Sequence, residues 1–380
     1  MAFATIDLTK GVTGVLPSAN ATYSTPRENA VPIIYNGDMS VAQRGTSFTG
    51  VSSGSNWPVD RFEFYPTNLG AYTIIQESLT SGEAYNNGFR TALRIDTTTA
   101  DASPAATDYA ILRGKLEGKD LGLFKKGTSS AEKFTLAFWV KSNKTTTGQV
   151  NLFDIDNNRL VSGTYTISSA NTWEKKIINF PADTTGGFDN DNALSLVVEF
   201  FLDSGSNFSS GTAPTAWEAQ TNADRNANNF AIGSSTDNDF AMTGVQLEVG
   251  EFSSTTIPPF QFETFGDNLE RCQRYFTKIT RGVANTSICN GRWYNNSNVG
   301  GMFHLPTSMR STPTLSITTG TNYYNASGTN ANNFFDDFTF NDAADLSLGW
   351  YKGSISGTQG DGIIFMTNNS NASVSFDSEI

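Results

Sequence analysis

Apolar and polar residues alternate along much of the chain, with the two-residue period of a β-strand that has one face in a core. The stretch 133–142 is typical, because its apolar side chains fall at every second position: Phe134, Leu136, Phe138 and Val140. In 194–203 the second face is partly apolar too, through Val197 and Phe201. We therefore expect this strand to lie in the middle of its sheet.

Short strands of this kind, separated by turn-forming residues, fill most of the chain after residue 30. In the first unit the predicted strands are 33–38, 61–65, 71–78, 92–96, 109–116, 133–142, 149–156, 163–167, 173–180, 194–203 and 240–249. In a second unit they are 287–294, 300–306, 314–320, 335–340, 347–355, 361–367 and 372–378. The predicted fold class is therefore all-β, with a jelly-roll or β-sandwich body and a second, C-terminal β-sandwich.

The segment between the two units has its own pattern. The alternation in 240–249 changes phase near Gly244, which predicts a β-bulge. Pro258 and Pro259 cannot donate to a ladder, so 253–264 is predicted to be an extended connector.

One convincing helix is predicted, over 267–278. Asp267 is the expected N-cap, and Glu270 stands at the capping-box position. Lys278 lies at the C-terminal end, where the helix dipole favours a positive charge. One apolar stripe at helical spacing supports it: Leu269, Cys272, Phe276 and Ile279.

These patterns divide the chain into an N-terminal arm (1–30), a jelly-roll domain (31–265) and a helix followed by a β-rich tip (266–380). The arm has too little apolar pattern to fold alone, so it is either a disordered tail or a segment that becomes ordered against a partner. Trp217 lies in the long polar loop 204–238. We expect it to pin the loop to the sandwich, with contact to a partner as the alternative.

Composition narrows the possible partners. The 380 residues carry a formal net charge of −12, and only 16% of them are charged. Nucleic acid and anionic membranes both demand basic surface, so neither is an expected partner. A strongly anionic polysaccharide is disfavoured as well, unless basic residues cluster locally. No apolar run approaches the length of a membrane span, so membrane insertion is not expected.

Candidate catalytic and metal groups are sparse. Cys272 and Cys289 are too few for a disulfide framework, and no zinc spacing is present. His304 is the only histidine, so any Ser-His-Asp or Cys-His arrangement would have to use it. We interpret it as an ordinary strand residue and predict no catalytic residue, no cofactor and no assigned metal site. A glycosidase needs only two carboxylates, but no rung repeat of a polysaccharide-cleaving β-helix is present.

Two acidic clusters are candidate calcium-binding sites. Asp154 and Asp156 alternate in one of them, and Asp189 and Asp191 in the other. Oxygen ligands at such spacing suit calcium, but the EF-hand glycine and distal glutamate are absent. Turn-forming Asp between strands is the favoured interpretation.

Several motifs resemble bacteriophage tail-fibre and tail-appendage proteins. The GVQLE strand at 244–248 precedes CQRYF at 272–276, which is similar to the GVQLE and CQRYY-like junction of that family. The stretch NGDMSVAQRGTSF, residues 36–48, and the DRF segment at 60–62 resemble the same family's large β domain. The resemblance covers roughly residues 1–279. It implies a carbohydrate-binding-module-like jelly roll, a homotrimeric fibre, and attachment to other tail proteins through the arm.

Aromatic pairs in the tip supply candidate glycan-binding residues. Adjacent strand residues point to opposite faces, so each pair can place one ring in the core and one outside, where it can stack on a sugar. The six candidates are Trp293, Tyr294, Tyr323, Tyr324, Trp350 and Tyr351.

The predicted function is a non-enzymatic virion protein, made in the host cytoplasm, that binds a host surface polysaccharide during adsorption. A purely structural connector of the tail or head and a glycan-degrading tailspike are the alternatives. Whether the tip or the jelly roll binds the glycan is left open by the sequence.

Overall fold

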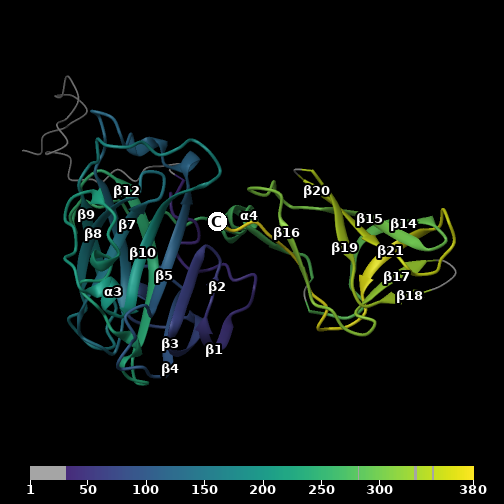
Figure 1. Ribbon diagram of the computed structural model, residues 1–380, viewed down its shortest axis with the longest axis horizontal. Helices are drawn as coiled ribbons and strands as arrows, with labels where there is room; N and C mark the ends of the chain where they lie inside the picture. The colour runs from purple at the N-terminus through teal and green to yellow at the C-terminus, as the bar shows by residue number, and fades with distance from the viewer. Residues whose placement is uncertain (1–30, 281, 329–331, 345) are drawn as a thin grey trace, which may run out of the picture.

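The computed structural model describes residues 31–280, 282–328, 332–344 and 346–380. Two β-rich parts of unequal size meet at a narrow waist, where the helix α4 (Phe265–Gln273) lies (Figure 1). We call residues 31–264 the body and residues 276–378 the tip. The predicted all-β class is confirmed. The predicted arm, 1–30, lies outside the described residues.

The body is built from antiparallel strands. They are β1 (Ser47–Ser53), β2 (Asn56–Val59), β3 (Phe62–Ser78), β4 (Thr91–Thr99), β5 (Tyr109–Glu117), β6 (Phe134–Lys141), β7 (Thr147–Asp154), β8 (Arg159–Thr166), β9 (Glu174–Phe180), β10 (Leu194–Ser204), β11 (Glu218–Ala219) and β12 (Asp239–Val249). Short helical turns connect some of them: α2 (Glu83–Asn86), α3 (Ser206–Ser209), η2 (Gly118–Asp120), η3 (Gly122–Phe124), η4 (Asn222–Asp224) and η5 (Ile232–Ser234).

These strands form one continuous sheet in the order β11-β8-β7-β10-β5-β3-β4-β12-β6-β9, and β1 and β2 pair with β3. The long strand β3 turns the corner, because 62–67 pair with β5 and 71–78 pair with β4. Gly70 sits at the bend with φ +62, and a Cβ there would lie 2.1 Å from the Thr99 carbonyl oxygen. The sheet therefore folds into a front layer (β8-β7-β10-β5 and the first half of β3) and a back layer.

The body core fills the space between the two layers. Phe200 of the front layer and Phe138 of the back layer meet edge to face, with ring centroids 5.0 Å apart. The strand β10 is buried along nearly its whole length between β5 and β7, so its predicted central position is confirmed. The predicted bulge is confirmed as well, because the β12–β6 register shifts between Thr243 and Gln246, around Gly244 at φ +63.

The tip is a smaller sandwich. Its strands are β13 (Phe276–Lys278), β14 (Ser287–Asn295), β15 (Asn298–His304), β16 (Thr314–Ile317), β17 (Tyr324–Gly328), β18 (Asn332–Phe335), β19 (Thr339–Ala344), β20 (Ser347–Lys352), β21 (Gly362–Thr367) and β22 (Val374–Asp377). Seven of them form the sheet β18-β17-β21-β14-β15-β20-β19, and three form β13-β22-β16. A separate apolar cluster, with Trp350, Tyr324 and Phe365 at its centre, makes the tip core.

Two sequence predictions are wrong in detail. Residues 33–38 form turns instead of a strand, although the Asn-Gly turn is present: the Met39 amide donates to the Asn36 carbonyl at 2.9 Å. The helix begins and ends earlier than 267–278. Thr264 is its N-cap, accepting from the Asp267 amide at 3.2 Å, and the chain after Gln273 enters a strand.

The family-like motifs meet at the waist. The side chain of Asn268 on α4 accepts a hydrogen bond from the Asn36 amide at 3.1 Å and donates one to the Asp38 carboxylate at 3.1 Å. The Val245 amide donates to the Gly37 carbonyl at 2.9 Å. Segments more than 200 residues apart in the chain are thereby tied into one structure. The motifs that carry the resemblance build a junction.

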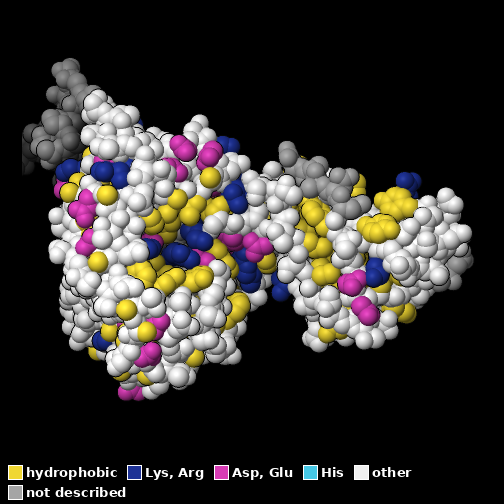
Figure 2. Space-filling model, in the orientation of Figure 1, with side chains coloured by type: hydrophobic (Ala, Val, Ile, Leu, Met, Phe, Trp, Pro, Cys, Tyr) yellow, Lys and Arg dark blue, Asp and Glu magenta, His cyan; other side chains and the backbone are white. Residues whose placement is uncertain are grey.

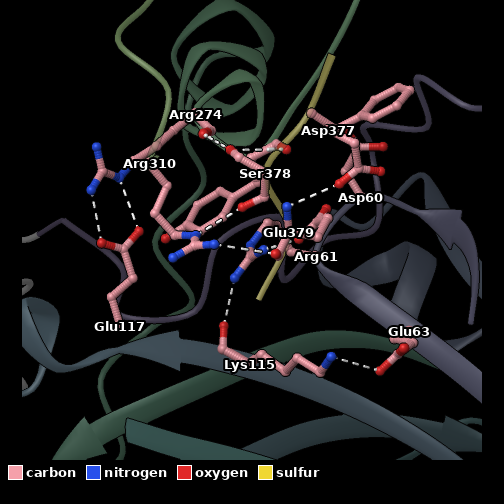
Figure 3. Close-up of polar contacts among 12 residues, drawn as sticks. Asp60, Arg61, Glu63, Lys115, Glu117, Arg274, Arg310, Asp377, Ser378 and Glu379 are labelled. Atoms are coloured by element: carbon pink, nitrogen blue, oxygen red, sulfur yellow. Dashed lines mark hydrogen bonds and ion pairs between the residues drawn. The ribbon is translucent and has the colours of Figure 1, made fainter. Parts of the chain in front are cut away.

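Residues 374–379 return from the tip to the body at the same place (Figure 3). Glu379 is almost fully buried between Arg44 and Arg61, and Asp377 pairs with Arg44 at 2.9 Å. The Arg61 guanidinium also lies 3.3 Å from the centre of the Tyr275 ring. We call this group the junction socket: Arg44, Arg61, Tyr275, Asp377 and Glu379.

Candidate functional site

The structure divides the six predicted aromatic residues into inner and outer rings. Trp293, Tyr324 and Trp350 are in the tip core, with exposed fractions of 3%, 0% and 1%. Tyr294 is 45% exposed, and Tyr323 and Tyr351 are half-buried. Each pair thus has one ring inside and one nearer the surface. The inner rings pack against other side chains and cannot reach a ligand in this structure.

Two of the outer tyrosines neighbour the same glycine of β15, and the third lies elsewhere. Tyr294 leans over Gly300, and Tyr351 is the cross-strand partner of the same glycine. Tyr323 precedes β17 elsewhere in the tip. The face around Tyr294 carries an open depression of about 600 Å³ that Arg292, Met302 and His304 also line. His304 is exposed at the end of β15, without a nucleophile arrangement beside it in the described part of the tip.

A second surface lies on the body, on the outer face of the front layer. A cavity of about 230 Å³ opens there, and its lining residues come from β5, β10 and the loop that follows β10: Tyr109, Ile111, Arg113, Phe201, Phe208, Asn222 and Arg225. We call this surface the groove. In Figure 2, hydrophobic and basic side chains gather in a hollow over β5 and β10.

Stacked aromatic rings form one side of the groove. Tyr65 and Tyr109 are half-buried and nearly parallel, with centroids 6.0 Å apart and planes 14° apart. Phe208 meets Tyr109 edge to face at 5.1 Å, and Phe201 lies 5.8 Å from Phe208. Sugars present flat C–H faces, and partly exposed rings of this kind can stack on them.

Two arginines border the rings, and each is held by a buried glutamate. Arg113 donates to the Glu63 carboxylate at 2.9 Å, while Arg225 donates to Glu199 at 3.2 Å through its Nε. Both glutamates are about 1% exposed. The arginines also lie 5.0 Å from the rings of Tyr65 and Phe201, respectively. Their N–H groups are therefore fixed in position before any ligand arrives.

The charges in this cluster reinforce one another. Burial raises the pKa of the Glu63 carboxyl, but Arg113 and Lys115 outweigh that effect, so its pKa lies below the ordinary value. Burial lowers the pKa of the Lys115 ammonium, although Glu63 opposes the change. Glu63 consequently stays ionised and keeps Arg113 in place at neutral pH.

Sequence reasoning missed most of the groove. The apolar second face of 194–203, Val197 and Phe201, was the available signal. Tyr65 and Tyr109 stand at outward positions of their strands, and nothing in either strand alone shows that the two meet. Phe208 and Arg225 come from the loop 205–231, whose path over the sheet depends on tertiary contacts. Trp217 pins that loop as predicted, since its indole donates to the Pro181 carbonyl at 2.8 Å.

Two of the acidic positions considered for calcium, Asp154 and Asp156, have protein partners for their carboxylates. Asp154 is fully buried and paired with the ammonium of Lys126, which also lies 3.0 Å from Asp183. Asp156 accepts from the Asp189 amide at 2.9 Å. Across the described ranges, no group of three or more His, Cys, Asp or Glu residues could hold a metal ion. No helix in those ranges is long and apolar enough to cross a membrane.

Comparisons with known proteins gave weak structural similarities. No protein-family model and no curated protein matches the chain. The enzymatically active domain of tailspike protein 4 of bacteriophage CBA120 aligns with 50% of this chain at 13% identity and a TM-score of 0.28. The alignment covers 19% of the tailspike chain, so this chain spans about a fifth of its length.

Two sugar-related structures also align with the chain. A putative sugar-binding protein from Bacteroides thetaiotaomicron covers 58% of it at 12% identity and a TM-score of 0.29, over 100% of its own length. The family 11 carbohydrate-binding module from Clostridium thermocellum covers 55% at 11% identity and a TM-score of 0.26, over 98% of its length. Similarity at this level does not establish a function.

Proposed function

We propose that this protein is a non-enzymatic component of a bacteriophage tail that binds a host surface glycan, and that the groove on the body contacts the sugar. The observation that carries the glycan proposal is the groove itself. Half-buried tyrosine rings lie beside two arginines whose positions buried glutamates fix. This combination matches the apolar faces and hydroxyl groups of a sugar.

The role in a phage tail rests on the sequence resemblance. The matching residues build the waist, so they support a shared architecture and leave the ligand to other surfaces. On this proposal the tip projects away from the virion, and residues 1–30 join other tail proteins. The three outer rings of the tip, Tyr294, Tyr323 and Tyr351, are the second candidate surface for glycan.

Tyr109→Ala is expected to weaken glycan binding about five- to tenfold, because one stacked ring contributes on the order of 1 kcal/mol. Tyr109→Phe keeps the ring and should bind nearly as the parent does. A glycan array with the purified protein would identify the sugar, and titration of that sugar would measure both variants after thermal unfolding confirms that they fold.

Tyr294→Ala is the parallel variant for the tip. A loss of binding in Tyr294→Ala with none in Tyr109→Ala would move the site to the tip. Binding to no glycan at all would favour the connector alternative. Release of oligosaccharides from host polysaccharide would identify the protein as a degrading tailspike and overturn the non-enzymatic proposal.

A homotrimer is part of the same proposal. The resemblance implies it, and other exposed apolar side chains of the tip could be buried between chains: Phe334, Leu346 and Ile364. Burial of such patches drives association. We expect a molar mass three times that of the chain in light scattering at micromolar concentration, and a stable monomer would contradict it.

A further inference from the structure

A separate cavity lies at the waist. Its volume is about 370 Å³, and three parts of the chain line it: Lys119 and Asn192 of the body, Arg274 just after α4, and the 305–313 connection of the tip. Basic side chains gather near the waist in Figure 2. None of the groove residues named above lines this cavity.

Arg310 reaches into the waist with hydrogen-bonding capacity to spare. Its guanidinium donates to three backbone carbonyls: Ser378 at 2.8 Å, Asn192 at 2.9 Å and Glu379 at 3.3 Å. These bonds use the Nε–H and one N–H on each terminal nitrogen. Figure 3 shows Arg310 beside Ser378 and Glu379. A guanidinium has five N–H groups, so one remains on each terminal nitrogen. Free N–H groups on a guanidinium can donate to a carboxylate or phosphate.

The cations of this cavity are incompletely neutralised. Among the residues that the structure describes, Arg274 alone of the three has a carboxylate partner, Glu117, at 2.7 Å. Lys119 is exposed at the rim. Burial lowers the pKa of Arg310; Glu117 opposes this, whereas the charges of Arg61 and Arg274 add to it. An anion in the cavity would supply the missing negative charge.

The lining of the cavity is also polar. The side-chain oxygen of Asn192 is buried and has no hydrogen-bond partner, although its amide nitrogen donates to the Arg310 carbonyl at 3.1 Å. Ser308, Ser311 and Thr312 add hydroxyl groups to the lining. Each of these hydroxyl groups can both donate to and accept from the hydroxyls of a sugar.

We propose that the waist cavity binds an acidic sugar, with its carboxylate or phosphate on Arg310 and Lys119 and its ring hydroxyls against Ser308, Ser311 and Thr312. The chain as a whole is acidic, so a local group of cations is what such a ligand requires. The ligand would contact the body and the tip at once. This site is independent of the groove and does not rest on the proposed function.

The test uses calorimetric titration of the full chain with four probes: glucuronate, glucose 6-phosphate, glucose and inorganic phosphate. Glucuronate or glucose 6-phosphate should bind, and glucose should not. Lys119→Gln should weaken that binding about three- to tenfold, the range between an exposed and a well-formed charged contact. Lys175→Gln removes the same charge from an exposed site on β9 and should leave the binding unchanged.

The Tyr109→Ala variant distinguishes binding in the waist cavity from binding in the groove. It should bind glucuronate as tightly as the parent protein does. Absence of binding by both acidic sugars, equal binding of glucose, or an unchanged Lys119→Gln variant would overturn the proposal. Inorganic phosphate that binds as tightly as either acidic sugar would overturn the assignment to a sugar. Lys119 is exposed and unpaired among the described residues, so its replacement leaves the fold intact.

Discussion

Lys126→Met is expected to destabilise the body by about 3–5 kcal/mol, because it leaves a buried carboxylate without its cation. Lys126 and Asp154 are both fully buried, and the ammonium also donates to the carbonyls of Thr185 at 3.1 Å and Gly186 at 2.7 Å. Asp183 keeps Arg159 as a second cationic partner, whereas Asp154 loses the lysine with which it pairs. In calorimetry the midpoint temperature of the unfolding transition of the body should fall by about 10 °C.

The adjacent lysine provides a matched control. Lys125 is 53% exposed and pairs with Glu132 on the surface, so Lys125→Met should change stability by less than about 1 kcal/mol. Adding Asp154→Asn to Lys126→Met should recover part of the loss, since the unpaired charge is then gone. Equal stability of the two lysine variants would show that the buried pair is not what holds these strands.

Arg61→Met is expected to weaken the junction socket by about 3 kcal/mol, because Glu379 would keep only one of its two buried cations. Arg61 also donates to the Lys115 carbonyl at 2.6 Å and covers the Tyr275 ring. Hydrogen exchange should speed up in β13 and β22, which end at the socket, while β6 and β10 in the body core stay protected.

Arg90→Met is the control for the ring contact. Arg90 also covers a tyrosine, Tyr85 at 4.1 Å, but it is exposed and no ion pair holds it among the described residues. Its loss should cost about 0.5–1 kcal/mol. If Arg61→Met exchanged no faster than Arg90→Met in β22, the socket would be stabilised by apolar packing instead.

The strands of the fold were predictable because one face of each lies in a core. The period-two pattern in 133–142 and 194–203 follows from the burial of side chains such as Phe138 and Phe200. The pattern failed at 33–38. Apolar residues there pack as turns held by side chains such as Asn36, which donates to the Val41 and Asp60 carbonyls. Bonds of that kind are not visible in hydrophobic spacing.

The helix shows how tertiary pairing changes an end. Helical spacing continues to Phe276, yet Phe276–Lys278 form a strand that pairs with β22, about 100 residues later. Long-range pairing overrides local helix propensity here. The groove was not predicted because it too depends on contacts between segments far apart in the sequence. Glu63, Glu199 and Phe201 occupy outward strand positions and are nonetheless buried, because other segments cover that face.

The adjacency of β13 and β22 has a consequence for how this protein can change. The two strands pair side by side, with Lys278 opposite Ser375, and nearly the whole tip is inserted between them. Residues 279–373 can therefore be treated as a cassette whose two splice points are neighbours in space. The socket residues that anchor it lie outside the cassette. Exchanging this one fragment of the coding sequence would replace most of the tip surface while keeping the body and the socket residues, provided that the new fragment supplies the contacts of Arg310 to Asn192, Ser378 and Glu379.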